Sequence, residues 1–151
     1  MLSALQARDM VKTVTEAHPA GITFYPISNE PKDKPTEPEY PFLATALPDT
    51  QTDRTSLGIY LTSFDFSCIV VGQTASARTP DQLDGTHSTA HGYAMDIALE
   101  LGSHYPNDIE VSRIRTTPII DEGTGYETGV LLRFRMTDTT PLCSSTEFTY
   151  G

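Results

Sequence analysis

The sequence is poor in cysteine, in basic side chains and in long hydrophobic runs. Two cysteines in 151 residues are too few for a disulfide framework, and Cys68 lies in an apolar run where a small buried thiol is the ordinary finding. No apolar run approaches the roughly 20 residues that cross a bilayer. The first residues also lack the basic and apolar regions of a signal peptide. These absences argue against a disulfide scaffold, a membrane span and conventional secretion, and they favour synthesis in a reducing cytoplasm.

Acidic side chains outnumber basic ones two to one. Twenty Asp and Glu oppose ten Lys and Arg, which gives a formal net charge of -10 and a sequence pI near 4.6. Such a charge repels the nucleic-acid backbone at long range. The composition therefore argues against a general DNA-binding protein, while a surface past which DNA slides without sticking remains compatible with it.

What is present is the composition of one folded domain. A chain of 151 residues with 38% hydrophobic and 20% charged side chains can bury a single core. We therefore expect one domain over residues 1–151, with no internal repeat.

Periodicity predicts two helices and several strands. Ser3 and Gln6 form the capping-box pattern before a helix over residues 4–17, and a second helix runs through Ala90 and ends before Gly102. Alternating or continuous apolar residues predict strands, and polar segments predict loops at 48–56 and 72–85. The predicted fold is α+β, a mainly antiparallel β-sheet flanked by two α-helices on one face, with a long Pro-rich arm. The expected strands are 22–27, 42–47, 57–61, 64–71, 110–120 and 129–136.

The Pro-rich arm covers residues 28–41. Proline at positions 31, 35, 38 and 41 alternates with charged residues, a composition that suits neither a helix nor a central strand. Only Tyr40 offers a large apolar anchor, so the arm cannot order itself by burial. We expect the arm, and the polar tail over 137–151, to contact neighbouring subunits. The arm residues assigned to this contact are Pro31, Pro35, Pro38 and Tyr40.

Two histidines are the nearest approach to a chemical site. His87 and His91 are four residues apart at the start of the second predicted helix, a spacing seen in zinc sites. The residues between them lack the glutamate of a metalloprotease helix, and no third ligand has a recognisable spacing from them. We therefore expect no metal, no cofactor and no catalysis. A small soluble enzyme or ligand-binding domain with a site near His87 and His91 remains the alternative.

Four of the ten basic residues lie on two neighbouring predicted strands. They are Arg113 and Arg115 on one strand and Arg133 and Arg135 on the next. Residues two apart on a strand point to the same face, so a register that pairs Arg113 with Arg133 would place all four on one side. Two interpretations stay open. The arginines form either a solvated sheet face or a basic stripe that meets an acidic surface, which a second copy of this acidic chain can supply.

The order of elements resembles a known class of protein. The elements that carry this similarity are the opening helix, the strand with Phe24-Tyr25-Pro26, the run Tyr40-Pro41-Phe42-Leu43, the long strand through Phe64-Asp65-Phe66, the helix ending near Leu101 and the two arginine-bearing strands. Their layout is similar to that of small neck and tail-completion proteins of tailed bacteriophages. The tail-terminator type is the most similar.

This resemblance implies a structural virion subunit with no enzymatic activity. It implies a homo-oligomeric ring, typically six-fold, at the head–tail junction or at the end of the tail tube. The ring's partners would be neighbouring neck and tail-tube or connector proteins, and genomic DNA would pass through without specific binding. A module of a phage-derived tail-like machine would share the same layout.

Overall fold

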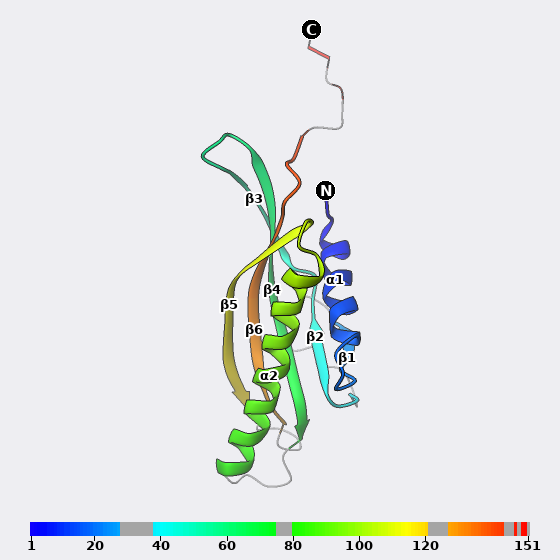
Figure 1. Ribbon diagram of the computed structural model, residues 1–151, viewed down its shortest axis with the longest axis vertical. Coiled ribbons are helices and arrows are strands. Elements are labelled where there is room, and N and C mark those ends of the chain that lie inside the picture. The colour runs from blue at the N-terminus through cyan, green and yellow to red at the C-terminus, as the bar shows by residue number, and fades with distance from the viewer. Residues whose placement is uncertain (28–37, 75–79, 121–126, 144–146, 148, 151) are drawn as a thin grey trace.

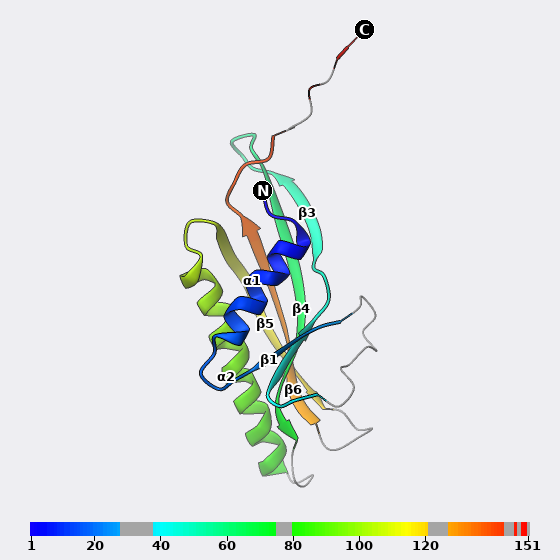
Figure 2. The same ribbon diagram turned by 90° about the vertical axis from the view of Figure 1, so that its right-hand side faces the viewer.

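One sheet carries both helices on the same face (Figures 1 and 2). The computed structural model describes residues 1–27, 38–74, 80–120, 127–143, 147, 149 and 150. Its elements, in chain order, are α1 (Ala4–Glu16), β1 (Thr23–Pro26), β2 (Phe42–Thr45), β3 (Asp49–Arg54), β4 (Tyr60–Thr74), α2 (Pro80–His104), β5 (Ile109–Ile120) and β6 (Glu127–Asp138).

The six-stranded sheet is built around β4. Its order is β1-β2-β4-β6-β5, and β3 pairs with the first half of β4 on the side where β2 pairs with the second half. The β1–β2 pair is parallel and every other pair is antiparallel. The predicted α+β class, with a mainly antiparallel sheet and two helices on one face, is therefore confirmed.

The main core lies between the helices and the sheet. Phe64, Phe66, Cys68 and Val70 alternate along β4 with their side chains in this core, as their spacing predicts. The Phe66 ring stacks on Phe134 of β6 with centroids 5.0 Å apart. Both helices add small and branched side chains to the same core, namely Ala7, Val11 and Val14 of α1 and Ala94, Ile97, Ala98 and Leu101 of α2.

The predicted capping box opens α1. The Ser3 hydroxyl accepts a hydrogen bond from the Gln6 backbone N–H, and the Gln6 side chain accepts one from the Ser3 N–H. Two of the backbone donors at this helix end are thereby satisfied.

The prediction of a polar loop over residues 48–56 was wrong. Residues 49–54 form β3, which pairs with β4 from Asp49 opposite Asp65 to Arg54 opposite Tyr60. All six side chains of β3 are exposed, so neither face of the strand is buried and no hydrophobic alternation marks it. The β3–β4 hairpin projects beyond the ends of β5 and β6 (Figure 1).

The second helix is longer than predicted at both ends. It begins at Pro80, inside the predicted loop over 72–85, because proline suits a first helical position and Asp81 suits the positive end of the helix dipole. Thr86, in its second turn, is buried against Thr128 of β6. The helix also passes through Gly102 and ends at His104, with the Tyr105 N–H bonded to the Leu101 carbonyl.

The described end of the predicted arm packs on its own subunit. The Glu39 N–H donates to the Tyr25 hydroxyl at 3.0 Å, and the Tyr40 ring lies 5.5 Å from the ring of Phe42. Phe42 belongs to a second small core with Ala44 and Val71, on the face of the sheet away from the helices. Tyr40 keeps 37% of its surface exposed, so its predicted contact with a neighbour stays a prediction.

Parts of the predicted arm and tail lie outside the described residues. They include Pro31 and Pro35 of the arm, whereas Pro38 is described and half-buried. The first two residues of the predicted 137–151 tail belong to β6, which ends at Asp138. Beyond β6, the Leu142 N–H donates to the Tyr60 carbonyl at 2.9 Å and so ties this segment to β4.

The two cysteines differ in reactivity. Cys68 is buried in the main core, and this burial raises the pKa of its thiol to about 12, although a hydrogen bond with Thr45 acts in the opposite direction. Cys143 is exposed, and both thiols are free. The thiolate is the reactive form, so at pH 8 a thiol reagent should label native protein once and denatured protein twice. Cys143→Ser should abolish the native labelling, and rapid labelling of that variant would contradict the burial of Cys68.

Candidate interaction surface

The arginines lie on the face of the sheet that the helices leave open. Leu132 and Phe134 of β6 point into the main core, so Arg133 and Arg135 between them point to the opposite face. Arg115 of β5 lies directly opposite Arg133 and shares that face. Arg115, Arg133 and Arg135 therefore lie on one side of neighbouring strands, where the sequence placed all four arginines on condition that Arg113 paired with Arg133.

The register of the two strands differs from the one considered. Arg133 pairs with Arg115 rather than Arg113, and Arg135 pairs with Ser112. Between these pairs the register shifts at a bulge, where Arg113 adopts a left-handed conformation with φ of 55°. That conformation costs a non-glycine residue roughly 1 kcal/mol. The extra residue lets Ile114 pack against the main core while Arg113 stays on the open face.

Arg135 is engaged within its own subunit. Its Nε donates to Oδ1 of Asp65 at 2.8 Å and its Nη2 donates to Oδ2 at 3.2 Å, across the β4–β6 pair. These hydrogen bonds, followed by the charges of Asp65 and Asp53, raise the pKa of Arg135 above its ordinary value. Bidentate pairing fixes this guanidinium in place.

The other three arginines form what we call the basic surface: Arg113, Arg115 and Arg133. All three are exposed, and among the described residues none of them has a hydrogen bond or ion pair. Like charges directly opposite each other on neighbouring strands are destabilising, and Arg115 faces Arg133 in this way. A carboxylate or phosphate placed between these two side chains would relieve that repulsion.

A shallow hollow adjoins the basic surface. It has a volume of about 290 Å³, and its walls include Arg113 and Arg133 beside Ser67 and the Asp65–Arg135 ion pair. Guanidinium groups with free donors, next to one that is already neutralised, can bind an acidic group from another molecule. The hollow therefore suits an anionic side chain.

The two histidines of the alternative site are held by the sheet. His87 Nδ1 lies 3.3 Å from the Gly129 carbonyl oxygen, and His91 Nδ1 lies 3.1 Å from the Thr116 hydroxyl. Their ring centroids are 6.4 Å apart. The described part of the chain holds no group of three or more His, Cys, Asp or Glu side chains suited to a metal ion.

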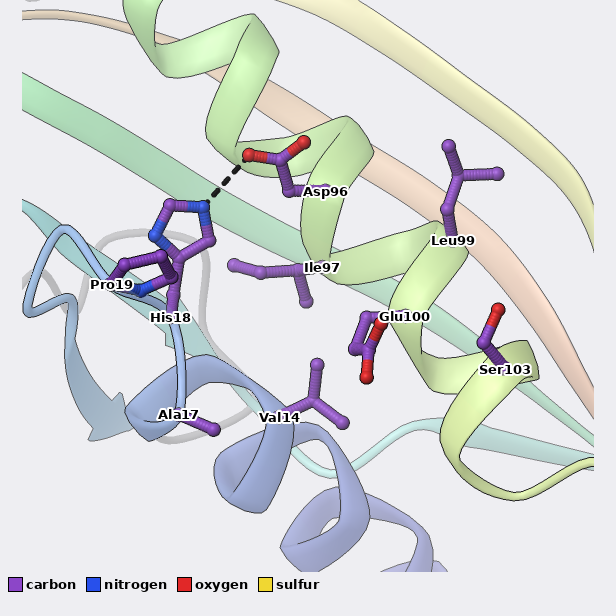
Figure 3. A pocket seen from close by; sticks show the side chains of 9 residues that line it. All are labelled: Val14, Ala17, His18, Pro19, Asp96, Ile97, Leu99, Glu100 and Ser103. Carbon is purple, nitrogen blue, oxygen red and sulfur yellow. Dashed lines mark hydrogen bonds and ion pairs between the residues drawn. The ribbon is translucent and has the colours of Figure 1, made fainter.

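Sequence reasoning missed a groove between α1 and α2 (Figure 3). Its volume is about 550 Å³. At one end His18 Nε2 lies 2.8 Å from Asp96 Oδ2, while His18 Nδ1 accepts the Ala20 N–H. Ser103 lies at the far end of the groove from His18, so the groove does not assemble a serine, histidine and aspartate for nucleophilic catalysis. The sequence signal that could have found it is Leu99, an apolar residue outside the helical spacing of the core residues of α2, and Leu99 is 58% exposed at the groove.

Comparison with known proteins gives no family for the chain. A scan against models of known protein families finds no match, and a search of curated proteins finds none either. Among the described residues, no helix is long and apolar enough to cross a membrane.

Proposed function

We propose that this chain is a structural subunit of a tailed-bacteriophage virion. Copies of it form a closed ring, six-fold in the simplest case, at the head–tail junction or at the end of the tail tube. The ring completes the tail, contacts neighbouring neck and tail-tube or connector proteins, and lets DNA pass. In this proposal the chain has no catalytic activity and its place is the virion, after synthesis in the host cytoplasm.

The observation that carries this proposal is the basic surface itself. Three exposed arginines without a partner in the described part of the chain lie on the open face of the sheet, in a protein of formal charge -10. A chain that is acidic elsewhere presents this face to acidic protein surfaces, and another copy of the same chain has such surfaces. The resemblance in layout to tail-terminator-like proteins adds the ring and its location.

The net charge of a ring bears on two parts of the proposal: the contacts between subunits and the passage of DNA. A ring of six copies would carry ~60 negative charges, and screening over a Debye length of about 8 Å only partly removes their mutual repulsion. Complementary patches between subunits offset that repulsion. The remaining negative charge keeps DNA from adhering to the ring as it passes.

Native mass spectrometry and electron microscopy of the purified chain test this proposal. At tens of micromolar and moderate salt we expect one closed ring of a single stoichiometry. A chain that stays strictly monomeric in solution and in particle images would overturn the proposed function.

A further inference from the structure

We propose that copies of this chain join head to tail, with the acidic strand β3 of one copy seated on the basic surface of the next. The inference rests on the proposed function, because it names what binds to the basic surface from which that function is argued. It assigns two different patches of each subunit to the contact, one on the β3–β4 hairpin and one on β5 and β6.

The first face is a pair of carboxylates on β3. Asp49 and Asp53 are four residues apart on the strand and therefore point to the same side, the side of Asp65. Both are exposed, and in the described residues neither forms an ion pair, although the charge of Asp53 also acts on Arg135 of its own subunit. Gln51 Nε2 donates to Asp53 Oδ2 at 2.8 Å, which orients that carboxylate. We call Asp49 and Asp53 the acidic pair.

The acidic pair and the basic surface lie on the same open face of the sheet, toward its two opposite edges. β3 flanks β4 on one side, and β6 and then β5 follow on the other. Neighbouring strands are about 4.8 Å apart, so β3 lies three spacings, or about 14 Å, from β5. The acidic pair is complementary in charge to the basic surface, and among the described residues no ion pair joins the two within one subunit. A second copy can satisfy both.

The position of the hairpin makes such contact accessible. The β3–β4 hairpin projects beyond the ends of β5 and β6, and no helix covers β3 (Figures 1 and 2). On the receiving side, the repulsion between Arg115 and Arg133 would be relieved by a carboxylate between them.

A head-to-tail contact between two different patches has a geometric consequence. It uses the hairpin of one copy and the basic surface of the next, so it leaves one basic surface and one hairpin free for further copies. Such heterologous contacts generate closed rings or open filaments. The contact thus provides the connectivity that the proposed ring requires.

Charge reversal in two variants tests the inference. Arg113→Glu with Arg133→Glu reverses the basic surface, and Asp49→Arg with Asp53→Arg reverses the acidic pair. In each variant alone, the two patches carry net charges of the same sign, so we expect assembly at low salt to need about 100-fold more protein than the wild-type chain, or more. Mixed one to one, the variants should form alternating rings, because every contact again joins opposite charges.

Matched controls separate this contact from the effect of net charge. Asp9→Arg with Glu16→Arg adds the same charge as the acidic-pair variant, but on exposed positions of α1. This control keeps both patches and should assemble alone like the wild-type chain. Mixed with the basic-surface variant, it should form rings that exclude that variant, which native mass spectrometry shows because the two chains differ in mass. Incorporation of the basic-surface variant into these rings, as with the acidic-pair variant, would overturn the inference, because charge anywhere on the chain would then suffice.

The remaining outcomes are distinguishable. If the wild-type chain forms rings and both variants do so equally well, the inference fails and the proposed function stands. If the wild-type chain is monomeric, the proposed function and the inference both fail. A mixture that yields only two-chain complexes would overturn head-to-tail contact in favour of two-fold pairing. Binding of a short oligonucleotide to the wild-type ring, lost in the basic-surface variant, would show that nucleic acid and not the hairpin occupies the surface.

Discussion

Replacing Gly129 with alanine should lower the free energy of unfolding by roughly 3 kcal/mol, the upper end of what overpacking a well-filled site costs. A Cβ atom at this position would lie 2.3 Å from the Val70 carbonyl oxygen and 3.0 Å from Cγ2 of Val71. The nearer atom belongs to the backbone of β4, so the close pairing of β4 and β6 would have to open. The expected loss of stability is large because the central pair of strands, β4 and β6, would have to shift. Urea unfolding measures this loss.

Gly92→Ala provides the matched control. A Cβ added at Gly92, in the middle of α2, meets nothing within 4 Å. Alanine in place of an interior helical glycine should raise stability by about 0.5–1 kcal/mol. If Gly129→Ala unfolds at the same urea concentration as the wild-type chain, the close approach of β4 to Gly129 is wrong.

The sequence predicted those helices and strands that bury one face and expose the other, because their apolar and polar residues then alternate with a recognisable period. The alternation from Phe64 to Val70 and the helical spacing in α1 and α2 both mark elements with one face in the main core. β3 lacked this signal because it is exposed on every side, and its pairing with β4 supplies its order. The first turns of α2 were missed because small polar residues there resemble a loop.

The candidate site was predictable in its location but not in its detail. Arg133 and Arg135 lie two apart on a strand, which was enough to place them on one face. No glycine marks the bulge at Arg113, so the register could not be read from local sequence. The pairing of Arg135 with Asp65 depends on the β4–β6 register, across 70 positions of sequence. The His18–Asp96 contact is likewise set by how α1 packs on α2.

The double variant Arg113→Glu with Arg133→Glu should remain folded and lose assembly most strongly at low salt. Both side chains are exposed, and the change replaces the Arg115–Arg133 repulsion with an attraction. We therefore expect the stability of the monomer to stay within about 0.5 kcal/mol of wild type or to rise slightly. Thermal unfolding of dilute protein measures this part of the prediction.

The loss of assembly should depend on ionic strength. Each partly desolvated Arg–carboxylate contact contributes on the order of 1–3 kcal/mol, so reversing two arginines should weaken each subunit contact by about 100-fold or more at 50 mM salt. At 1 M salt the Debye length falls to about 3 Å, and the difference from wild type should shrink. Sedimentation velocity across this range measures both, with Arg8→Glu and Lys12→Glu on α1 as a control of equal charge. Normal assembly of the variant at low salt would show that the basic surface is only a solvated face of the sheet with no part in the contact. Failure of the variant to fold would instead assign Arg113 and Arg133 to a network within the subunit.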